Sequence, residues 1–114
     1  MLKIRIDPLD KLFSQYIRAR DKCCQRCGGT NGLQCAHFHG RAKRSTRWDE
    51  DNAVALGFGC HIYFTSHPLE FTEWFRKHLG EEKFDLLNAR ARITYPKPDK
   101  EAIRLYLEEK IRRL

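Results

Sequence analysis

The spacing of the cysteines constrains this chain more than any other feature of its sequence. Cys24 and Cys27 are separated by two residues, and Gly28 and Gly29 follow them. This is the spacing of a zinc knuckle, in which two thiolates bind one ion and glycines permit the sharp turn. Structural zinc takes four ligands, and Cys60 is the expected third. An odd total of five cysteines at tight local spacing disfavours a disulfide framework, so we expect a small core stabilised by structural zinc.

The sequence leaves the fourth zinc ligand open. A complete second knuckle would need a cysteine at position 57, where this chain has Gly57. Cys35 could complete a four-thiolate site, whereas Cys23 is a less suitable substitute because it directly precedes Cys24. In the alternative interpretation, some of these cysteines are small buried thiols and the chain holds no zinc.

The pattern of apolar residues predicts a single α+β domain over residues 1–114. A chain of this length is too short for two ordinary domains, and its 41% hydrophobic content is typical of a globular protein. Periodicity and Pro or Gly at segment ends predict a helix beginning at Asp7 and Pro8, strands over 33–39 and 53–56, and helices beginning at Cys60 and over 67–79, 81–93 and 99–113. The domain then consists of an N-terminal helix (1–22), the knuckle with two strands and a helix (23–67), and a helical tail (68–114). Apolar side chains of the tail would pack on the same chain or on a second copy, which allows a homodimer.

Positive charge is concentrated in one short segment, which we call the basic arm (residues 41–47). The chain has 22 Lys and Arg against 15 Asp and Glu, a net charge of +7. The arm supplies four cations and no acidic residue: Arg41, Lys43, Arg44 and Arg47. Because guanidinium and ammonium groups match phosphate oxygens, we predict that the arm contacts the phosphate backbone of a nucleic acid. The alternative is an ordinary solvated loop.

The sequence gives no indication of a membrane or secreted protein. No apolar run reaches the roughly 18 residues of a membrane span, and residues 1–5 lack the apolar core of a signal peptide. We therefore expect a cytoplasmic protein without a membrane partner.

Three further residues are placed where two antiparallel strands packed on a helix would bring them together. His37 lies on the first predicted strand, Asn52 directly precedes the second, and His61 lies at the start of the following helix. With this order, the chain resembles the HNH endonucleases, also called ββα-metal or His-Me finger nucleases. The resemblance is carried by residues 20–28, 33–38, 47–53 and 59–61, and residues 68–84 resemble the tail of small phage-encoded HNH and recombination-nuclease proteins.

The resemblance implies a metal-dependent DNA endonuclease in a bacterial or phage-infected cell. His37 matches the general base, which takes a proton from the water that attacks a phosphodiester. Asn52 matches the residue that braces the loop and orients the base. His61 matches a ligand of a single divalent cation (Mg, Mn or another transition metal) that stabilises the transition-state charge. Arg41, Lys43 and Arg44 occupy the loop that meets the DNA backbone in the family.

The chain departs from the family pattern immediately before the expected base. Many members carry an acidic residue or a second histidine there, which helps to hold the metal, whereas this chain has Ala36. His39, on the same predicted strand face as His37, or His67 could supply the missing ligand. His39 could also be the base, with His37 as a ligand.

Two other functions are consistent with the same residues. Ala36 and Gly57 both favour a zinc-containing DNA-binding module without catalytic activity. A phage-type assembly protein whose helical tail binds a partner is the third candidate.

Overall fold

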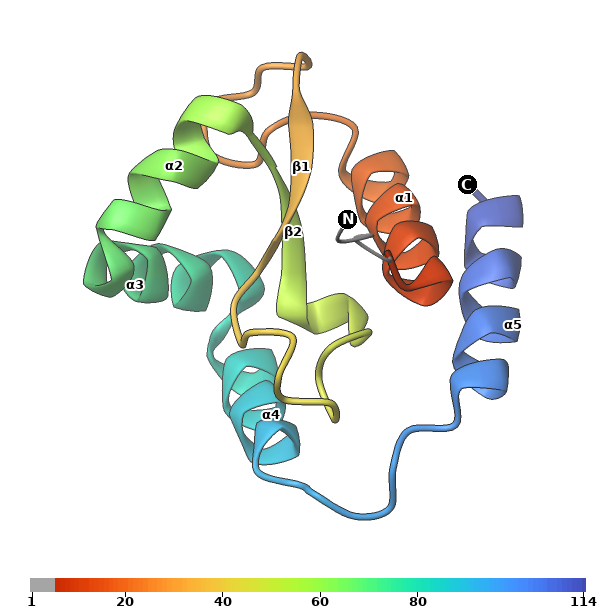
Figure 1. The fold of residues 1–114 in the computed structure, drawn as a ribbon. Coiled ribbons are helices and arrows are strands. Elements are labelled where there is room, and N and C mark those ends of the chain that lie inside the picture. The colour runs from red at the N-terminus through yellow and green to blue at the C-terminus, as the bar shows by residue number, and fades with distance from the viewer. Residues whose placement is uncertain (1–5) are drawn as a thin grey trace, which may run out of the picture.

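The computed structural model describes residues 6–114 (Figure 1). Residues 1–5 lie outside the described residues. Two predictions that fall on them, the first part of the N-terminal helix and the absence of a signal peptide, therefore stay predictions. The described elements, in chain order, are α1 (Pro8–Asp21), β1 (Leu33–His37), the 3-10 helix η1 (Glu50–Asn52), β2 (Ala53–Gly57), α2 (Phe58–Ser66), α3 (Pro68–Leu79), α4 (Glu81–Ala91) and α5 (Lys100–Arg112).

A two-stranded antiparallel sheet lies at the centre of the fold. β1 pairs with β2 in a register that sets Leu33 opposite Gly57 and His37 opposite Ala53. Helices α1 and α5 lie on one side of this hairpin, and α2, α3 and α4 lie on the other (Figure 1). The expected α+β class is therefore confirmed.

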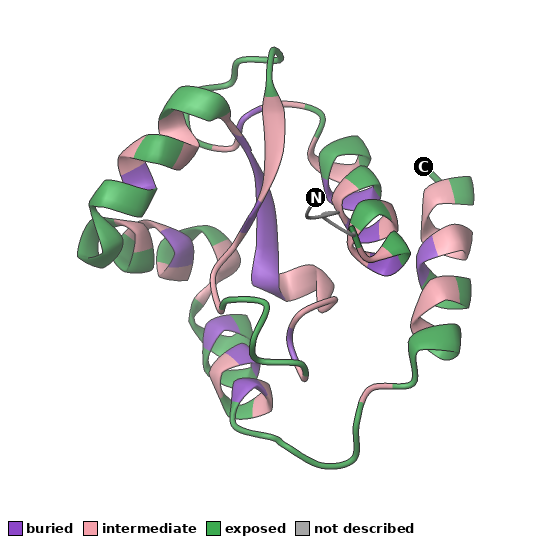
Figure 2. Cartoon of the chain, in the orientation of Figure 1, coloured by how far each residue is buried: buried purple, intermediate pink, exposed green. Residues whose placement is uncertain are grey.

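The hairpin separates two hydrophobic clusters, because successive side chains of a strand point to opposite faces. On the α1 side, Ala53 and Ala55 of β2 pack with Phe13, Ile17 and other residues. The cluster on the α2–α4 side consists of Cys24, Ala36, Val54, Leu56, Phe64, Phe75, Phe84 and Leu87. Both faces of β2 are thus covered, and Figure 2 shows this strand buried along most of its length.

Helix α5 packs on α1 and is fastened there by one carboxylate. Tyr16 of α1 and Tyr106 of α5 each donate a hydrogen bond of 2.8 Å to Glu50 of η1. Burial and the bond to Glu50 raise the pKa of Tyr16 to about 12, so its hydroxyl is a donor at neutral pH. The Leu107 side chain of α5 is fully buried in the same cluster. Glu50 therefore joins three elements that are far apart in the sequence.

Most predicted elements are confirmed, and their ends differ from the prediction by one or two residues. The strand predicted over 33–39 ends at His37, because after one more in-register bond from the Phe38 amide to the Asn52 carbonyl, the His39 amide donates to the Asn52 side chain at 2.8 Å. The helix predicted from Cys60 begins earlier, at Phe58. Across residues 6–114, no helix combines the length and the apolar character that crossing a membrane requires.

Candidate functional site

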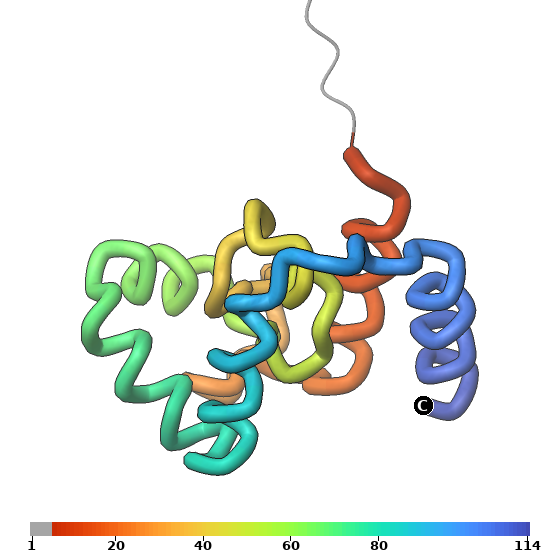
Figure 3. The backbone as a smooth tube through the Cα atoms, turned by 90° about the horizontal axis from the view of Figure 1, so that it is seen from below, coloured from red at the N-terminus to blue at the C-terminus, as the bar shows by residue number. Residues whose placement is uncertain are grey.

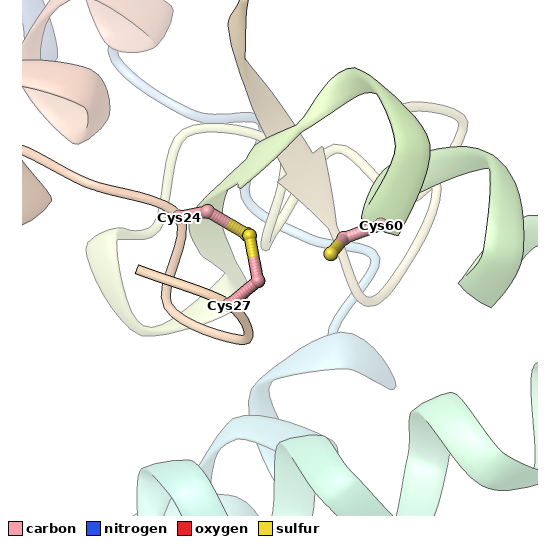
Figure 4. A group of neighbouring side chains, drawn as sticks. All are labelled: Cys24, Cys27 and Cys60. Atoms are coloured by element: carbon pink, nitrogen blue, oxygen red, sulfur yellow. The ribbon is translucent and has the colours of Figure 1, made fainter. Parts of the chain in front are cut away.

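Three cysteines from separate parts of the chain meet at the end of the hairpin. The sulfur atoms of Cys24, Cys27 and Cys60 all lie within 4.8 Å of one another, so they could hold a metal ion. Cys24 and Cys27 come from the loop after α1, and Cys60 comes from the first turn of α2 (Figure 4). Thiolates at this spacing are typical zinc ligands.

The backbone of the loop supports this cluster. The Gly28 amide donates to the Cys24 carbonyl at 2.8 Å. Gly28 has a φ of +81°, a backbone conformation that residues with a side chain rarely adopt. Burial raises the pKa of the Cys24 thiol, but backbone amides, including that of Gly57, donate to its sulfur and bring the pKa down to about 7. The guanidinium of Arg26 lies 3.5 Å from the sulfur of Cys60. At Cys24 these donors favour the thiolate form that a metal needs, whereas at Cys60 burial raises the pKa of the thiol in spite of Arg26.

Cys35 does not complete the site, contrary to the four-thiolate prediction. It pairs with Ala55 in the sheet and packs in the α1 cluster, away from the other three sulfur atoms. Burial there raises the pKa of Cys35 to about 12, so it is a small apolar core residue. Cys23 is likewise outside the group and receives a weak hydrogen bond from Gln25.

Gly57 occupies the position from which a fourth thiolate would be expected. A Cβ added at Gly57 would lie 4.0 Å from the sulfur of Cys24, with its nearest neighbours at 3.8 Å. That is ordinary van der Waals contact, and the φ of Gly57, −66°, suits any residue. The three-cysteine group therefore has room at position 57 for a fourth ligand.

A second candidate site is a cavity of about 640 Å³ between α1 and β1, which we call the histidine groove. Two of the predicted catalytic residues, His37 and His61, line it, and the charged lining consists of three cations and one acid: Lys11, Arg18, Arg41 and Asp10. The fold thus brings both histidines and part of the basic arm to one cavity.

His37 is oriented by the backbone of the arm. Its Nε2 lies 3.0 Å from the carbonyl oxygen of Arg47, and its ring packs beside Phe13. A carbonyl only accepts, so Nε2 carries the hydrogen and Nδ1 keeps a lone pair. Burial lowers the pKa of His37 below 6.5 and outweighs the bond to Arg47, so the ring is neutral at pH 7.

His61 is held in the complementary tautomer. Its Nδ1 lies 2.7 Å from Oε1 of Gln34 on β1, and this amide oxygen accepts, which leaves the lone pair on Nε2. Burial lowers the pKa of His61 as well. Metal-binding histidines are commonly oriented in this way by an acceptor on the other ring nitrogen.

Asn52 is fully buried and braces the loop between β1 and η1. Its amide nitrogen donates to the carbonyls of His39 at 2.9 Å and Thr46 at 3.0 Å, and its oxygen accepts from the His39 amide at 2.8 Å. Both ends of the loop that contains the basic arm are therefore fixed by one side chain.

His39 and His67 lie outside the histidine groove. The strand ends before His39, and its ring bonds to Asn88 of α4 at 2.8 Å, so it does not share a face with His37 as predicted. His67 bonds to the carbonyl of Tyr63 at 2.8 Å and stacks on its ring. Within residues 6–114, the cysteine group is the only set of three potential metal ligands at close range, and it includes no histidine.

The cations of the basic arm divide into two groups. Arg47 is committed to Asp10 of α1, with contacts of 3.0 and 2.5 Å, so the prediction that it binds phosphate is not supported. Arg41 is exposed and lies 3.5 Å from Asp10, while Lys43 and Arg44 are exposed. Lys43 and Arg44 are therefore available to a ligand, and the exposed Arg41 shares Asp10 with Arg47.

Asp10 and Gln34 are the site residues that the sequence analysis missed. Burial alone would raise the pKa of Asp10, but hydrogen bonds from Arg47 and Trp48 outweigh it and hold the pKa below its usual value. Asp10 pairs with a residue 37 positions later, and no local pattern marks that contact. Gln34 could have been noticed, because it precedes His37 on a short strand.

Searches against protein-family models, curated proteins and solved structures find no match to this chain. The functional argument therefore depends on the residues and their geometry.

Proposed function

We propose that this protein is a DNA endonuclease in which His37 acts as general base and the exposed cations of the basic arm hold the phosphate backbone. The observation that carries the proposal is the histidine groove. In it, His37 and His61 each have one ring nitrogen bound to an oxygen acceptor and the other left with a lone pair. Lys11, Arg18 and Arg41 line the same groove and complement a phosphate.

The chemistry follows from the tautomer of His37. Its Nδ1 accepts a proton from the water that attacks the phosphorus atom, and its lowered pKa keeps the ring unprotonated at neutral pH. Cations around the groove stabilise the negative charge that develops in the transition state. Asn52 supports this geometry by bracing the loop whose Arg47 carbonyl holds the His37 ring.

The divalent cation that the family resemblance implies has one clear protein ligand here, His61. The described residues offer no group of three histidine or carboxylate ligands at close range, so they do not form a complete cation site before substrate binds. The identity of this cation is tested with the reaction itself.

We assign structural zinc to the group formed by Cys24, Cys27 and Cys60. Three close sulfur atoms and the amide donors around Cys24 support this assignment. Metal analysis of protein never exposed to chelator should find close to one zinc per chain. A zinc content near zero in folded protein would refute the assignment.

The endonuclease proposal is tested by nicking of supercoiled plasmid with a panel of divalent cations and an EDTA control. Wild-type protein should nick DNA, and His37→Ala should abolish nicking while leaving DNA binding intact. His78→Ala is the matched control, because this exposed histidine stacks on Trp74 of α3 and does not line the groove. Equal nicking by His37→Ala and His78→Ala would refute the role of His37.

A DNA-binding module without catalytic activity is the second candidate, and the position of Ala36 favours it. Ala36 is buried in the α2–α4 cluster, so the residue before His37 offers the groove no ligand. The carboxylate that pairs with the arm, that of Asp10, is already bound by Arg47 and Trp48. Tight DNA binding without nicking in any metal would select this candidate.

A further inference from the structure

A second cavity lies on the other side of the basic arm, and we call it the arm groove. It has a volume of about 490 Å³ and lies between the arm and the connector (residues 92–99) that joins α4 to α5. Figure 3 shows the connector, drawn in blue, crossing beside the loop that carries the arm. Four cations line the groove, two from each wall, and no acidic residue does: Lys43, Arg44, Arg92 and Lys97.

These four cations are not used by the fold. Among residues 6–114, none of them forms a salt bridge, and all four are exposed. Their neighbours behave differently, because Arg47 binds Asp10 and Arg90 binds Asp49 at 2.7 Å. Four like charges that face one cavity repel each other, and a bound polyanion would relieve this repulsion.

Ser45 provides an independent indication of a ligand. It lines the same groove, and its hydroxyl oxygen is the one buried side-chain polar atom of residues 6–114 that lacks a hydrogen-bond partner. Buried polar groups are nearly always bonded, so this hydroxyl calls for a partner such as a phosphate oxygen. The remaining lining is partly apolar and includes Ile93 and Pro96, which suits the sugar of a nucleotide.

The arm groove and the histidine groove are close enough to engage one strand. Arg41 lines the histidine groove and Lys43 lines the arm groove. Two residues of extended chain span at most about 7 Å, and a DNA strand carries one phosphate per roughly 3.4 Å of helix axis. Phosphates of one strand can therefore reach both grooves.

We propose that the arm groove binds the DNA phosphates that flank the one presented to His37, and that Arg92 and Lys97 of the connector are contact residues. This inference depends on the proposed function for its substrate. It adds a second wall of contacts, more than 40 residues from the arm in the sequence, which the charge pattern did not single out.

The test is the salt dependence of DNA binding by the double variant Arg92→Ala with Lys97→Ala. The logarithm of the binding constant falls linearly with the logarithm of the salt concentration. Loss of two phosphate contacts should make this slope shallower by about 1.8 and weaken binding about tenfold or more. The matched control is Lys77→Ala with Lys83→Ala, which removes the same charge from exposed positions on α3 and α4 that do not line the arm groove. Equilibrium binding to a fluorescent duplex at several salt concentrations measures both quantities.

The outcomes distinguish failure of this inference from failure of the endonuclease proposal. A double variant whose slope and affinity match the control variant would refute the arm groove, even if the wild-type protein binds and nicks DNA. A wild-type protein that binds no DNA would refute both. A shallower slope in the Arg92 and Lys97 variant supports the arm groove, whether or not any variant nicks DNA.

Discussion

Introducing a cysteine at position 57 should complete the three-cysteine group as a metal site. The Gly57→Cys substitution creates a second two-residue spacing, with Cys60, and adds a thiol beside the existing three. Gly57 has a φ of −66° and ψ of 160°, which any residue adopts, so the backbone need not move. The added Cβ would lie 4.0 Å from the sulfur of Cys24. Sulfur atoms around tetrahedral zinc are about 3.8 Å apart, since each Zn–S bond is about 2.3 Å, so a sulfur one bond beyond this Cβ is within reach.

The gain in zinc affinity can be bounded from below. Residues that only support a metal ligand already change affinity about 10- to 100-fold. A directly bound thiolate should therefore tighten zinc binding at least about tenfold, or about 1.4 kcal/mol. Under saturating zinc the same free energy appears as stability, which corresponds to a rise in Tm of roughly 5 °C for a domain of this size.

The assay combines competition against a chromophoric chelator with Co²⁺ spectra, in which each thiolate bond adds charge-transfer absorbance. Gly59→Cys is the matched control, because a Cβ at Gly59 meets nothing within 4 Å and Gly59 lies in the first turn of α2, two residues after Gly57. Zinc affinity in folded Gly57→Cys protein that equals that of Gly59→Cys would refute the assignment of position 57 to the metal site.

Three further perturbations test separate parts of the structure. Cys24→Ser should lower Tm and zinc content, because structural zinc contributes directly to folding, whereas Cys35→Ser should leave zinc content near wild type. Glu50→Gln should lower the free energy of unfolding by about 2 kcal/mol in urea titrations, because it weakens two tyrosine bonds that join α1 and α5. The nicking rate should rise with pH through a midpoint below 6.5 and then level off, because burial lowers the pKa of His37. The free energy of unfolding should fall as pH drops below 6.5 toward that same value, because the unfolded chain then binds the proton first.

Each of these predictions has a matched control. Loss of zinc in the Cys35→Ser variant would show that Cys35 is a metal ligand. Glu109→Gln removes only exposed ion pairs on α5 and should cost at most about 0.5 kcal/mol, so an equal loss in the two glutamate variants would contradict the role of Glu50. A stability profile that is unchanged by His37→Gln between pH 5 and 7 would show that His37 does not titrate with folding.

The helices were predictable because their ends carry local signals. Asp7 accepts from the Leu9 amide at 2.9 Å as an N-cap, and Gly80 ends α3 with a φ of +96°. The pairing of Cys24 with Cys27 in the cysteine group was predictable for the same reason, since the two residues are close in the sequence.

Contacts between distant segments were not predictable from these signals. Whether a cysteine is a ligand or a core thiol depends on which strand face it occupies, and Cys35 faces α1. The direction of His39 depends on where β1 ends, and the Asn52 brace, formed 13 residues later, determines that end. The pairing of Arg47 with Asp10 depends on the docking of α1, so the charge pattern counted Arg47 as available.

The packing of α5 on α1 has a consequence for synthesis of the chain. Leu107 is made about 90 residues after Phe13, although both belong to the same hydrophobic cluster. At typical ribosomal rates of about 5–20 residues per second, the side of α1 that α5 covers stays exposed for roughly 5–20 seconds. The growing chain is therefore most prone to aggregation and to chaperone binding at α1, and protection should begin only as α5 leaves the ribosome.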